Sequence, residues 1–308
     1  MKFRLGGLAA VGLLRLAATA VGWDPSGHML VGQIAWEQCT PIARERVGAL
    51  VGTLEATYNE GQPYNFITAG CWMDDMRSKK GYAWGKWHYV NVPWSADGSA
   101  FELPPPPHIV WAIEGSLATL RTADVAPEKA AEALAMVIHF IGDIHQPMHA
   151  TDRGDRGGNG VLISGVPFTD LWNGTVPNLH AYWDAAFRFD QGEDEKVLQV
   201  WLSPTIAERP KAAGEGIIAA EAAKITARFP PSHFANVSAA KTAEAWARES
   251  HTLGCKFAYP VGSEASDHSL TPITPDFAHK SRRLAQERIA LAGYRLAELL
   301  NEIYGSKK

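Results

Sequence analysis

Apolar residues recur at helical spacing along most of the chain. The longest such stretch, residues 276–304, carries Leu284, Ile289 and Leu296 near helical spacing and ends at Gly305. Shorter stretches follow a proline or are rich in alanine, and they predict further helices at residues 41–55, 108–122, 127–145, 213–228 and 239–253. The pattern therefore indicates a mostly α protein.

One region departs from this pattern. Residues 151–178 are rich in Gly, Asp and Asn, and there Val161–Ser164 and Val166–Thr169 flank Gly165, which predicts one small β-hairpin. We find no repeat, linker or change of composition between residues 23 and 308. The sequence therefore predicts a single domain over that range.

The N-terminal residues 1–22 predict a secretory signal peptide. A short basic start precedes an apolar stretch, and the small residues Ala20 and Gly22 occupy the −3 and −1 positions of a cleavage site before Trp23. A membrane anchor is the alternative, but Arg15 interrupts the apolar run, which falls short of the roughly 20 residues needed to span a bilayer. We expect a secreted or periplasmic protein with no membrane attachment after cleavage.

Composition and charge narrow the class of protein. Apolar residues make up 46% of the 308 and charged residues 20%, which excludes a disordered, collagen-like or coiled-coil chain. The formal net charge of −4 becomes −7 without the leader, which holds three basic residues and no acidic one. This balance excludes a strongly basic binder of duplex DNA. The three cysteines, Cys39, Cys71 and Cys255, are too few for a disulfide scaffold. They permit one disulfide bridge, and the sequence does not determine which two would form it.

The strongest local signal is the segment His139-Phe-Ile-Gly-Asp143-Ile-His145-Gln-Pro147-Met-His149. Residues four apart share one face of a helix, so His139 and Asp143 are expected to hold the same ion. Pro147 cannot continue the helical hydrogen bonds, so the helix bends or ends there and His149 can reach a second ion. His145 points away from the 139/143 face, and we expect it behind a ligand or at the surface.

A second helix offers the same spacing at His180-Ala-Tyr-Trp-Asp184. Two helices that each present His-x3-Asp are a recurrent source of zinc ligands. Trp23 becomes a candidate only through processing, because a free terminal amine and its own carbonyl oxygen form a five-membered chelate. Spacing alone favours an ordinary surface or core role for three further candidates, His28, Asp74 and His88.

Taken in order, these motifs resemble the S1/P1-type zinc-dependent single-strand nucleases. The resemblance covers essentially all of residues 23–305 and rests on Trp23 with His28, Trp72-Met-Asp74-Asp-Met-Arg77, Trp87-His88-Tyr-Val, the 139–149 segment, Gly157-Gly158-Asn159, Leu179-His180-x-x-Trp183-Asp184 and the closing helix up to Gly305. No single motif is specific to this family, but the occurrence of so many motifs in the same order is specific. The resemblance implies a single helical domain of the phospholipase C/P1 nuclease type, with one small β-hairpin and three zinc ions in a cleft.

The resemblance also assigns ligands to each of the three ions. One zinc would be bound by Asp74, His88, His139 and Asp143. A second would be bound by His149, His180 and Asp184. The third would take the amine and carbonyl of Trp23, together with His28 and the bridging Asp143.

The implied activity is endonucleolytic hydrolysis of phosphodiester bonds in single-stranded DNA and RNA, leaving 5′-phosphates. The same site would also remove 3′-phosphates from nucleotides. A zinc-activated water would be the nucleophile, with Asp74 and Asp143 as catalytic residues and Arg77 adding fixed positive charge for the transition state. Single-stranded nucleic acid and 3′-nucleotides would be the substrates, and no protein partner is implied.

Substrate contacts are carried over at three positions. Tyr89 and Asn91 match the base pocket of the family, and Asn159 belongs to the glycine-rich run. The family's residue at the second position is often acidic, so Asn91 leaves the base preference open. A core aromatic is the alternative for Tyr89.

Two other functions remain open on sequence alone. A bacterial zinc phospholipase C shares the three-zinc plan and the N-terminal Trp, but such enzymes have Glu in place of Asp184 and lack the run Gly157–Asn159. A secreted zinc-binding protein without catalysis would have a closed, Cys-rich site, whereas here the ligands are His, Asp and a terminus. The sequence does not determine the organism, glycosylation at Asn173 and Asn236, DNA or RNA preference, pH optimum or oligomeric state.

Overall fold

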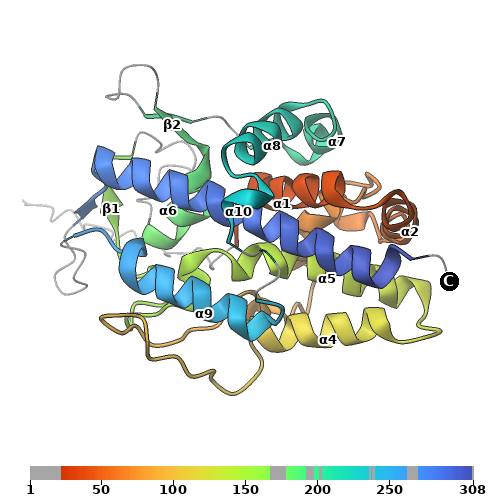
Figure 1. The fold of residues 1–308 in the computed structure, drawn as a ribbon, viewed down its shortest axis with the longest axis horizontal. Coiled ribbons are helices and arrows are strands. Elements are labelled where there is room, and N and C mark those ends of the chain that lie inside the picture. Colours follow the sequence, from red (N-terminus) through yellow and green to blue (C-terminus); the bar gives the residue numbers. More distant parts are fainter. Residues whose placement is uncertain are drawn as a thin grey trace, which may run out of the picture.

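The computed structural model describes residues 22–166, 178–191, 198–200, 203–235, 237, 240–261 and 270–306. Over these residues the chain is mostly helical (Figure 1), which confirms the predicted fold class. The α-helices are α1 (Pro25–Gln38), α2 (Pro41–Val51), α3 (Trp72–Asp75), α4 (Ile109–Arg121), α5 (Pro127–Ile144), α6 (Leu179–Ala185), α7 (Arg209–Ala212), α8 (Ile217–Arg228), α9 (Ala243–Leu253) and α10 (Pro275–Tyr304). The strands are β1 (Ile163–Ser164), β2 (Phe189–Gln191), β3 (Leu198–Val200) and β4 (Thr271–Pro272).

The predicted helices are present, with shifts at their ends. α10 begins at Pro275, because the side chain of Thr274 caps it by accepting a hydrogen bond from the Phe277 amide. α4 and α5 match the predicted ranges to within a residue or two. α2 is shorter than predicted, ending at Val51, and α8 begins only at Ile217.

The helix α1 was not predicted from the sequence. Pro25 occupies its first position, where a missing N–H has no cost, and the Asp24 side chain accepts hydrogen bonds from two backbone amides of the first turn. Residues 26–35 are all buried, so the helix lacks the polar face that reveals an amphipathic helix in a sequence. α1 carries His28 into the interior.

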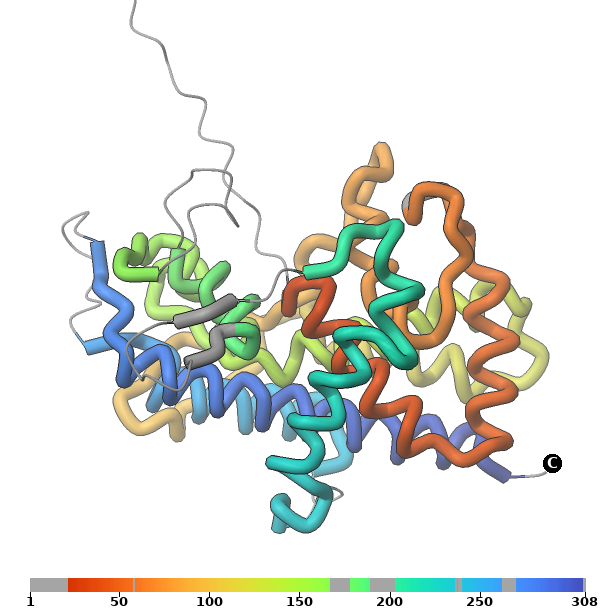
Figure 2. Tube along the Cα trace, turned by 90° about the horizontal axis from the view of Figure 1, so that it is seen from above, coloured from red at the N-terminus to blue at the C-terminus, as the bar shows by residue number. Residues whose placement is uncertain are grey.

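The long helix α10 and the central helix α5 organise the packing. α10 runs along the molecule and packs against α1, α2, α5 and α8 (Figures 1 and 2). α5 touches α1, α2, α4 and α10, and its second half, residues 137–144, is completely buried. His139 and Asp143 on that half are therefore core residues by position.

The β structure differs from the predicted hairpin. β1 pairs in parallel with β4, so its partner comes from near the end of the chain, while residues 167–169 lie outside the described residues. β2 and β3, which both come after α6 in the chain, form the antiparallel pair. Pairing with a strand about a hundred residues away leaves no local signal in the sequence.

Several expectations fall outside the described residues, namely the leader before Gly22, Asn173 and Asn236. The cysteines Cys39, Cys71 and Cys255 are all buried and free, so the permitted bridge is not formed. Among the described helices, none has the length and apolar character needed to cross a membrane.

Candidate metal centre

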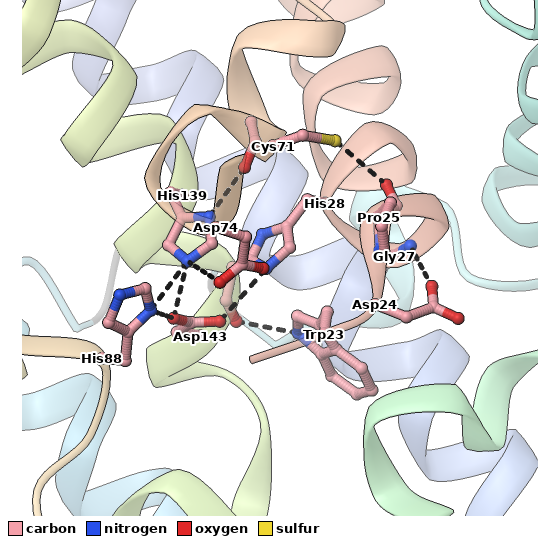
Figure 3. A network of polar contacts seen from close by, with 12 residues as sticks. Trp23, Asp24, Pro25, Gly27, His28, Cys71, Asp74, His88, His139 and Asp143 are labelled. Carbon is pink, nitrogen blue, oxygen red and sulfur yellow. Dashed lines mark hydrogen bonds and ion pairs between the residues drawn. The ribbon is translucent and has the colours of Figure 1, made fainter. Parts of the chain in front are cut away.

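Four polar side chains from four separate elements gather around Asp143. His139 and Asp143 lie one turn apart on α5, with His139 Nε2 3.1 Å from Asp143 Oδ2. His88, at the end of the 3₁₀ helix Gly85–His88, places Nδ1 3.1 Å from the same oxygen. His28 of α1 places Nε2 3.3 Å from Asp143 Oδ1. Figure 3 shows these side chains pointing toward one another, with Asp74 above Asp143.

Asp74 completes this first cluster from α3. Its Oδ1 lies 4.0 Å from His139 Nε2, and its Oδ2 lies 3.9 Å from His28 Nε2. Arg77, three residues further on, places Nε 3.1 Å from Asp74 Oδ1. The spacing of these two residues therefore brings one cation to the edge of the cluster.

A second cluster joins His149, His180 and Asp184. α5 ends at Ile144, and the 3₁₀ helix Pro147–Ala150 that follows turns His149 toward α6, which carries the other two residues. The Nε2 atoms of the two histidines lie 3.2 Å apart, and each lies 3.8 Å from Asp184 Oδ1. The predicted end of the helix before Pro147 is thus confirmed.

Backbone carbonyls fix the tautomers of three histidines. Nδ1 of His139 lies 2.7 Å from the carbonyl oxygen of Gly70, Nδ1 of His149 lies 2.6 Å from that of His88, and Nδ1 of His180 lies 2.6 Å from that of Gly157. A carbonyl oxygen can only accept, so each Nδ1 carries the proton and donates it. When the ring is neutral, the lone pair of each Nε2 is then directed into its cluster, where a cation can replace the proton.

This arrangement lacks donors for its inward-facing acceptors. Two unprotonated Nε2 atoms 3.2 Å apart, on His149 and His180, cannot hydrogen-bond to each other. In the first cluster, both ring nitrogens of His28 and Oδ1 of Asp143 are buried without a hydrogen-bond partner among the described residues. Such groups are costly to bury uncompensated, and a cation at each cluster would take the inward-facing lone pairs, one of them from His28.

Burial and neighbouring charge shift the pKa values in both clusters. Burial lowers the pKa of His88 to about 4. Burial acts the same way on His139, but the negative charges of Asp143 and Asp74 outweigh it and raise its pKa to about 8. Burial opposes the charged form of Asp143, yet the surrounding histidines hold its pKa well below its usual value. Burial raises the pKa of Asp184 well above its usual value, so that carboxylate has the greater need of a cation.

Two residues that support the clusters were missed by the sequence analysis. Gln146 donates from Nε2 to Asp184 Oδ1 at 2.8 Å, and its Oε1 accepts from the Met148 amide. The Tyr82 hydroxyl lies 2.7 Å from His88 Nε2. Gln146 lies in the 139–149 segment, so its position beside the proposed ligands could have indicated a supporting role. Nothing in the spacing of Tyr82 predicts its contact with His88.

Other expected site residues lie as follows. Tyr89, directly after His88, is partly buried, and Asn91, two residues further on, is exposed. Asn159 donates from Nδ2 to the carbonyl oxygen of Arg156. His145 is not at the surface: it is completely buried, and its Nε2 accepts from Arg295 at 2.9 Å. The surface alternative for His145 was wrong because the packing of α10 supplies a buried donor that the sequence spacing does not reveal.

Trp23 lies in the core beside the first cluster. Its side chain is completely buried, and its indole Nε1 donates to the carbonyl oxygen of Gly142 at 2.8 Å, one residue before Asp143 (Figure 3). The backbone just before it is crowded against the cluster, because a Cβ built on Gly22 would fall 1.6 Å from Asp143 Oδ1. The backbone nitrogen of Trp23 is therefore held close to Asp143.

Three groups of described residues have the composition and geometry to hold metal ions, namely His28–His139–Asp143, Asp74–His88–His139 and His149–His180–Asp184. Within each group the nearest ligand atoms lie within 4.8 Å of one another. Together they contain every histidine and aspartate that was expected as a ligand.

Comparison with protein families matches residues 23–305 to the S1/P1 nucleases. Endonuclease 2 of Arabidopsis thaliana is 25% identical over 313 residues, which cover 97% of this chain and 96% of that protein. Nuclease P1 of Penicillium citrinum is 24% identical over 303 residues, covering 92% of this chain and 99% of that protein. Nuclease S1 of Aspergillus oryzae is 29% identical over 181 residues, covering 57% of this chain and 55% of that protein.

The match extends over nearly the whole chain and includes the elements that carry both His/Asp clusters. The mostly helical fold agrees with it. The chain belongs to the S1/P1 nuclease family and is a hydrolase that acts on nucleic acid.

Proposed function

We propose that the mature protein is a secreted zinc-dependent endonuclease that hydrolyses single-stranded DNA and RNA to 5′-phosphate products and removes 3′-phosphates from nucleotides. The main support is the pair of buried clusters in which backbone carbonyls hold the histidine lone pairs inward. Zinc takes nitrogen and oxygen ligands of this kind, and a site without cysteine leaves positions open for water and substrate.

Three ions account for the ligand sets in this proposal. The first is assigned to Asp74, His88, His139 and Asp143, the second to His149, His180 and Asp184, and the third to Trp23, His28 and Asp143. The separation of the candidate ligands into groups around Asp143 and around Asp184 supports more than one ion.

The proximity of Gly22 to Asp143 supports a ligand role for the terminus of Trp23. In the uncleaved chain the nitrogen of Trp23 is an amide, which is a poor ligand. Cleavage after Gly22 would convert it to an amine beside His28 and Asp143. We therefore include a leader over residues 1–22 and a single nuclease domain over residues 23–308 in the proposal.

Zinc bound at these clusters would lower the pKa of a water molecule to about 7 and stabilise negative charge on phosphoryl oxygens. The protein's own contribution is to fix the geometry. The Gly70, His88 and Gly157 carbonyls orient the histidines, and Gln146 orients Asp184, so little reorganisation is needed during reaction.

Arg77 is assigned to the transition state. Its Nε is held 3.1 Å from Asp74 Oδ1 while 19% of its side chain stays exposed, so its guanidinium lies at the border between the cluster and solvent. A planar cation in that position suits the extra negative charge of an in-line phosphoryl displacement.

Substrate contacts are assigned to Tyr89, Asn91 and Asn159. A ring beside the metal centre can stack an unpaired base, which contributes roughly 1–3 kcal/mol without reading sequence. The deep burial of the ligands favours a flexible single strand over a duplex, because bases held stacked in a duplex cannot bring the backbone to buried ligands.

Hydrolysis assays on contrasting substrates test the proposal. The mature protein, loaded with zinc, is offered single-stranded DNA, single-stranded RNA, a 3′-nucleotide and a choline phospholipid, each with and without chelator. We expect chelator-sensitive hydrolysis of the first three only. Hydrolysis of the phospholipid alone would assign a phospholipase, and bound zinc without any hydrolysis would assign a binding protein.

A further inference from the structure

The net negative charge of the chain hides one basic segment. Residues 77–87, here called the 77–87 segment, contain Arg77 and three lysines, at 79, 80 and 86, and no acidic residue. All three lysines are exposed. The segment connects Arg77 to the proposed ligand His88, so both of its ends lie at the metal centre.

The same segment contains three aromatic residues, Tyr82, Trp84 and Trp87. Tyr82 and Trp84 meet edge to face with ring centroids 5.4 Å apart, Trp84 lies 6.2 Å from Trp87, and Trp87 meets Trp111 of α4 edge to face at 5.1 Å. Trp84 also stacks on the buried Trp72. The rings form one continuous cluster from the metal centre to the surface.

Both ends of this aromatic cluster are defined. At the inner end, the hydroxyl of Tyr82 lies 2.7 Å from Nε2 of His88. At the outer end, Trp111 is 44% exposed, and it lines a cavity of about 320 Å³ together with Trp87. α4, which carries Trp111, lies at the edge of the helical assembly (Figure 1).

The cavity beside Trp111 has the character of a base-binding site. Its floor is formed by α4 and α5, with Ala112, Gly115, Ala133 and Met136 among its apolar members, and Ser116, Thr119, Lys129 and Glu132 as its polar ones. Flat aromatic walls, small apolar residues and a few polar groups suit a nucleobase. The exposed lysines of the 77–87 segment lie in the chain between Arg77 at the metal centre and Trp87 of this cavity, and their charge complements that of a phosphodiester backbone.

We propose that the 77–87 segment and Trp111 form an extended binding surface for single-stranded nucleic acid, separate from the Tyr89 and Asn91 pocket. The lysines contact phosphates beyond the one that is cleaved, and Trp87 and Trp111 receive a base in the cavity between α4 and α5. This inference rests on the proposed nuclease function and adds a preference for strands longer than a dinucleotide.

The test compares the zinc-loaded protein on a dinucleoside monophosphate and on a 12-nucleotide oligothymidylate. The value of kcat/KM per bond is measured for each, and its salt dependence is measured for the longer strand. The Trp111→Ala variant should lower kcat/KM at least about five-fold on the 12-mer, the loss expected for one base stack, and leave the dinucleotide unchanged. The combined Lys79→Gln, Lys80→Gln and Lys86→Gln variant should flatten the log–log salt slope by about 2, since each phosphate contact on a single strand contributes roughly 0.7.

Two matched controls remove an exposed aromatic and an exposed lysine from elsewhere. Phe257→Ala and Lys280→Gln, at positions that are 56% and 73% exposed, should leave both the length preference and the salt slope unchanged. Equal kcat/KM per bond on both strands, or variants indistinguishable from these controls, would overturn this inference while leaving the nuclease intact. Absence of hydrolysis of both strands by the unaltered protein would instead refute the proposed function. If Trp111→Ala does not fold, the salt dependence of the triple lysine variant still tests the inference, because all three lysines are exposed.

Discussion

Replacement of Gly157 by alanine tests whether the loop before α6 holds the second cluster in place. Gly157 has φ +60°, and its carbonyl oxygen accepts the proton of His180 Nδ1 at 2.6 Å. A Cβ at this position would lie 2.9 Å from the carbonyl oxygen of Met148, which is backbone and cannot swing away. Gly154, in the same loop, has φ +82° and nothing within 4 Å of a Cβ, so Gly154→Ala is a matched control.

The expected magnitudes follow from these contacts. A non-glycine residue in the left-handed region costs about 1–2 kcal/mol, and both variants incur that cost. Gly157→Ala must also shift the loop, which weakens one hydrogen bond worth about 1 kcal/mol. Loss of the partner that orients a metal ligand typically reduces metal affinity 10–100-fold, or about 1.4–2.7 kcal/mol. The zinc-loaded Gly157→Ala protein should therefore be about 2–4 kcal/mol less stable than the Gly154→Ala protein.

Denaturant unfolding of both variants, with zinc and after chelation, measures this difference. We expect the gap between them to shrink to about 1 kcal/mol after chelation, when only the hydrogen bond distinguishes them. Metal analysis of Gly157→Ala should show a deficit at one site, and that of Gly154→Ala none. Equal stability and equal zinc content in the two variants would show that the Gly157 carbonyl does not support a metal ligand.

Four further outcomes are expected. Asp143→Ala should lose metal and melt at lower temperature, because two ligand sets share Asp143, and unchanged zinc content by metal analysis would contradict the bridging role. A protein that retains one residue before Trp23 should lack one of three zinc ions and most activity until that residue is removed, as metal analysis and rate measurements before and after cleavage would show. Arg77→Ala should keep its zinc but lose roughly 10²-fold in turnover, and a change confined to substrate affinity would limit Arg77 to positioning. Burial and the charges of Arg288 and Arg295 hold the pKa of His145 well below its usual value. Below about pH 6.5 the unfolded chain therefore binds a proton that the native protein does not, and the free energy of unfolding should fall by up to about 1.4 kcal/mol for each unit by which the pH is lowered. Denaturant unfolding at several pH values should show that this part of the pH dependence disappears in His145→Gln.

Features that depend on local spacing could be predicted from the amino-acid sequence alone. A helix places residues four apart on one face, so the pairs His139 with Asp143 and His180 with Asp184 could be recognised from their spacing in the chain. The proline in the 139–149 segment likewise predicted the end of α5, because it cannot continue the helical hydrogen bonds. Helical spacing of apolar residues located α10, and preceding prolines located α4 and α5, whereas α1 has no polar face over its buried residues and gave no amphipathic signal.

The distant residues that join these pairs are set by tertiary packing. His28, Asp74 and His88 join the cluster around Asp143 because α1, α3 and the 3₁₀ helix before Tyr89 pack around α5, and no periodicity encodes that packing. The same packing brings Arg295 to His145 and the carbonyl of Gly157 to His180. Spacing along a helix is set by covalent geometry, so the ligand pairs could be predicted from the sequence. Contacts between elements depend on the joint packing of many side chains from distant parts of the chain, so the complete clusters could not be predicted.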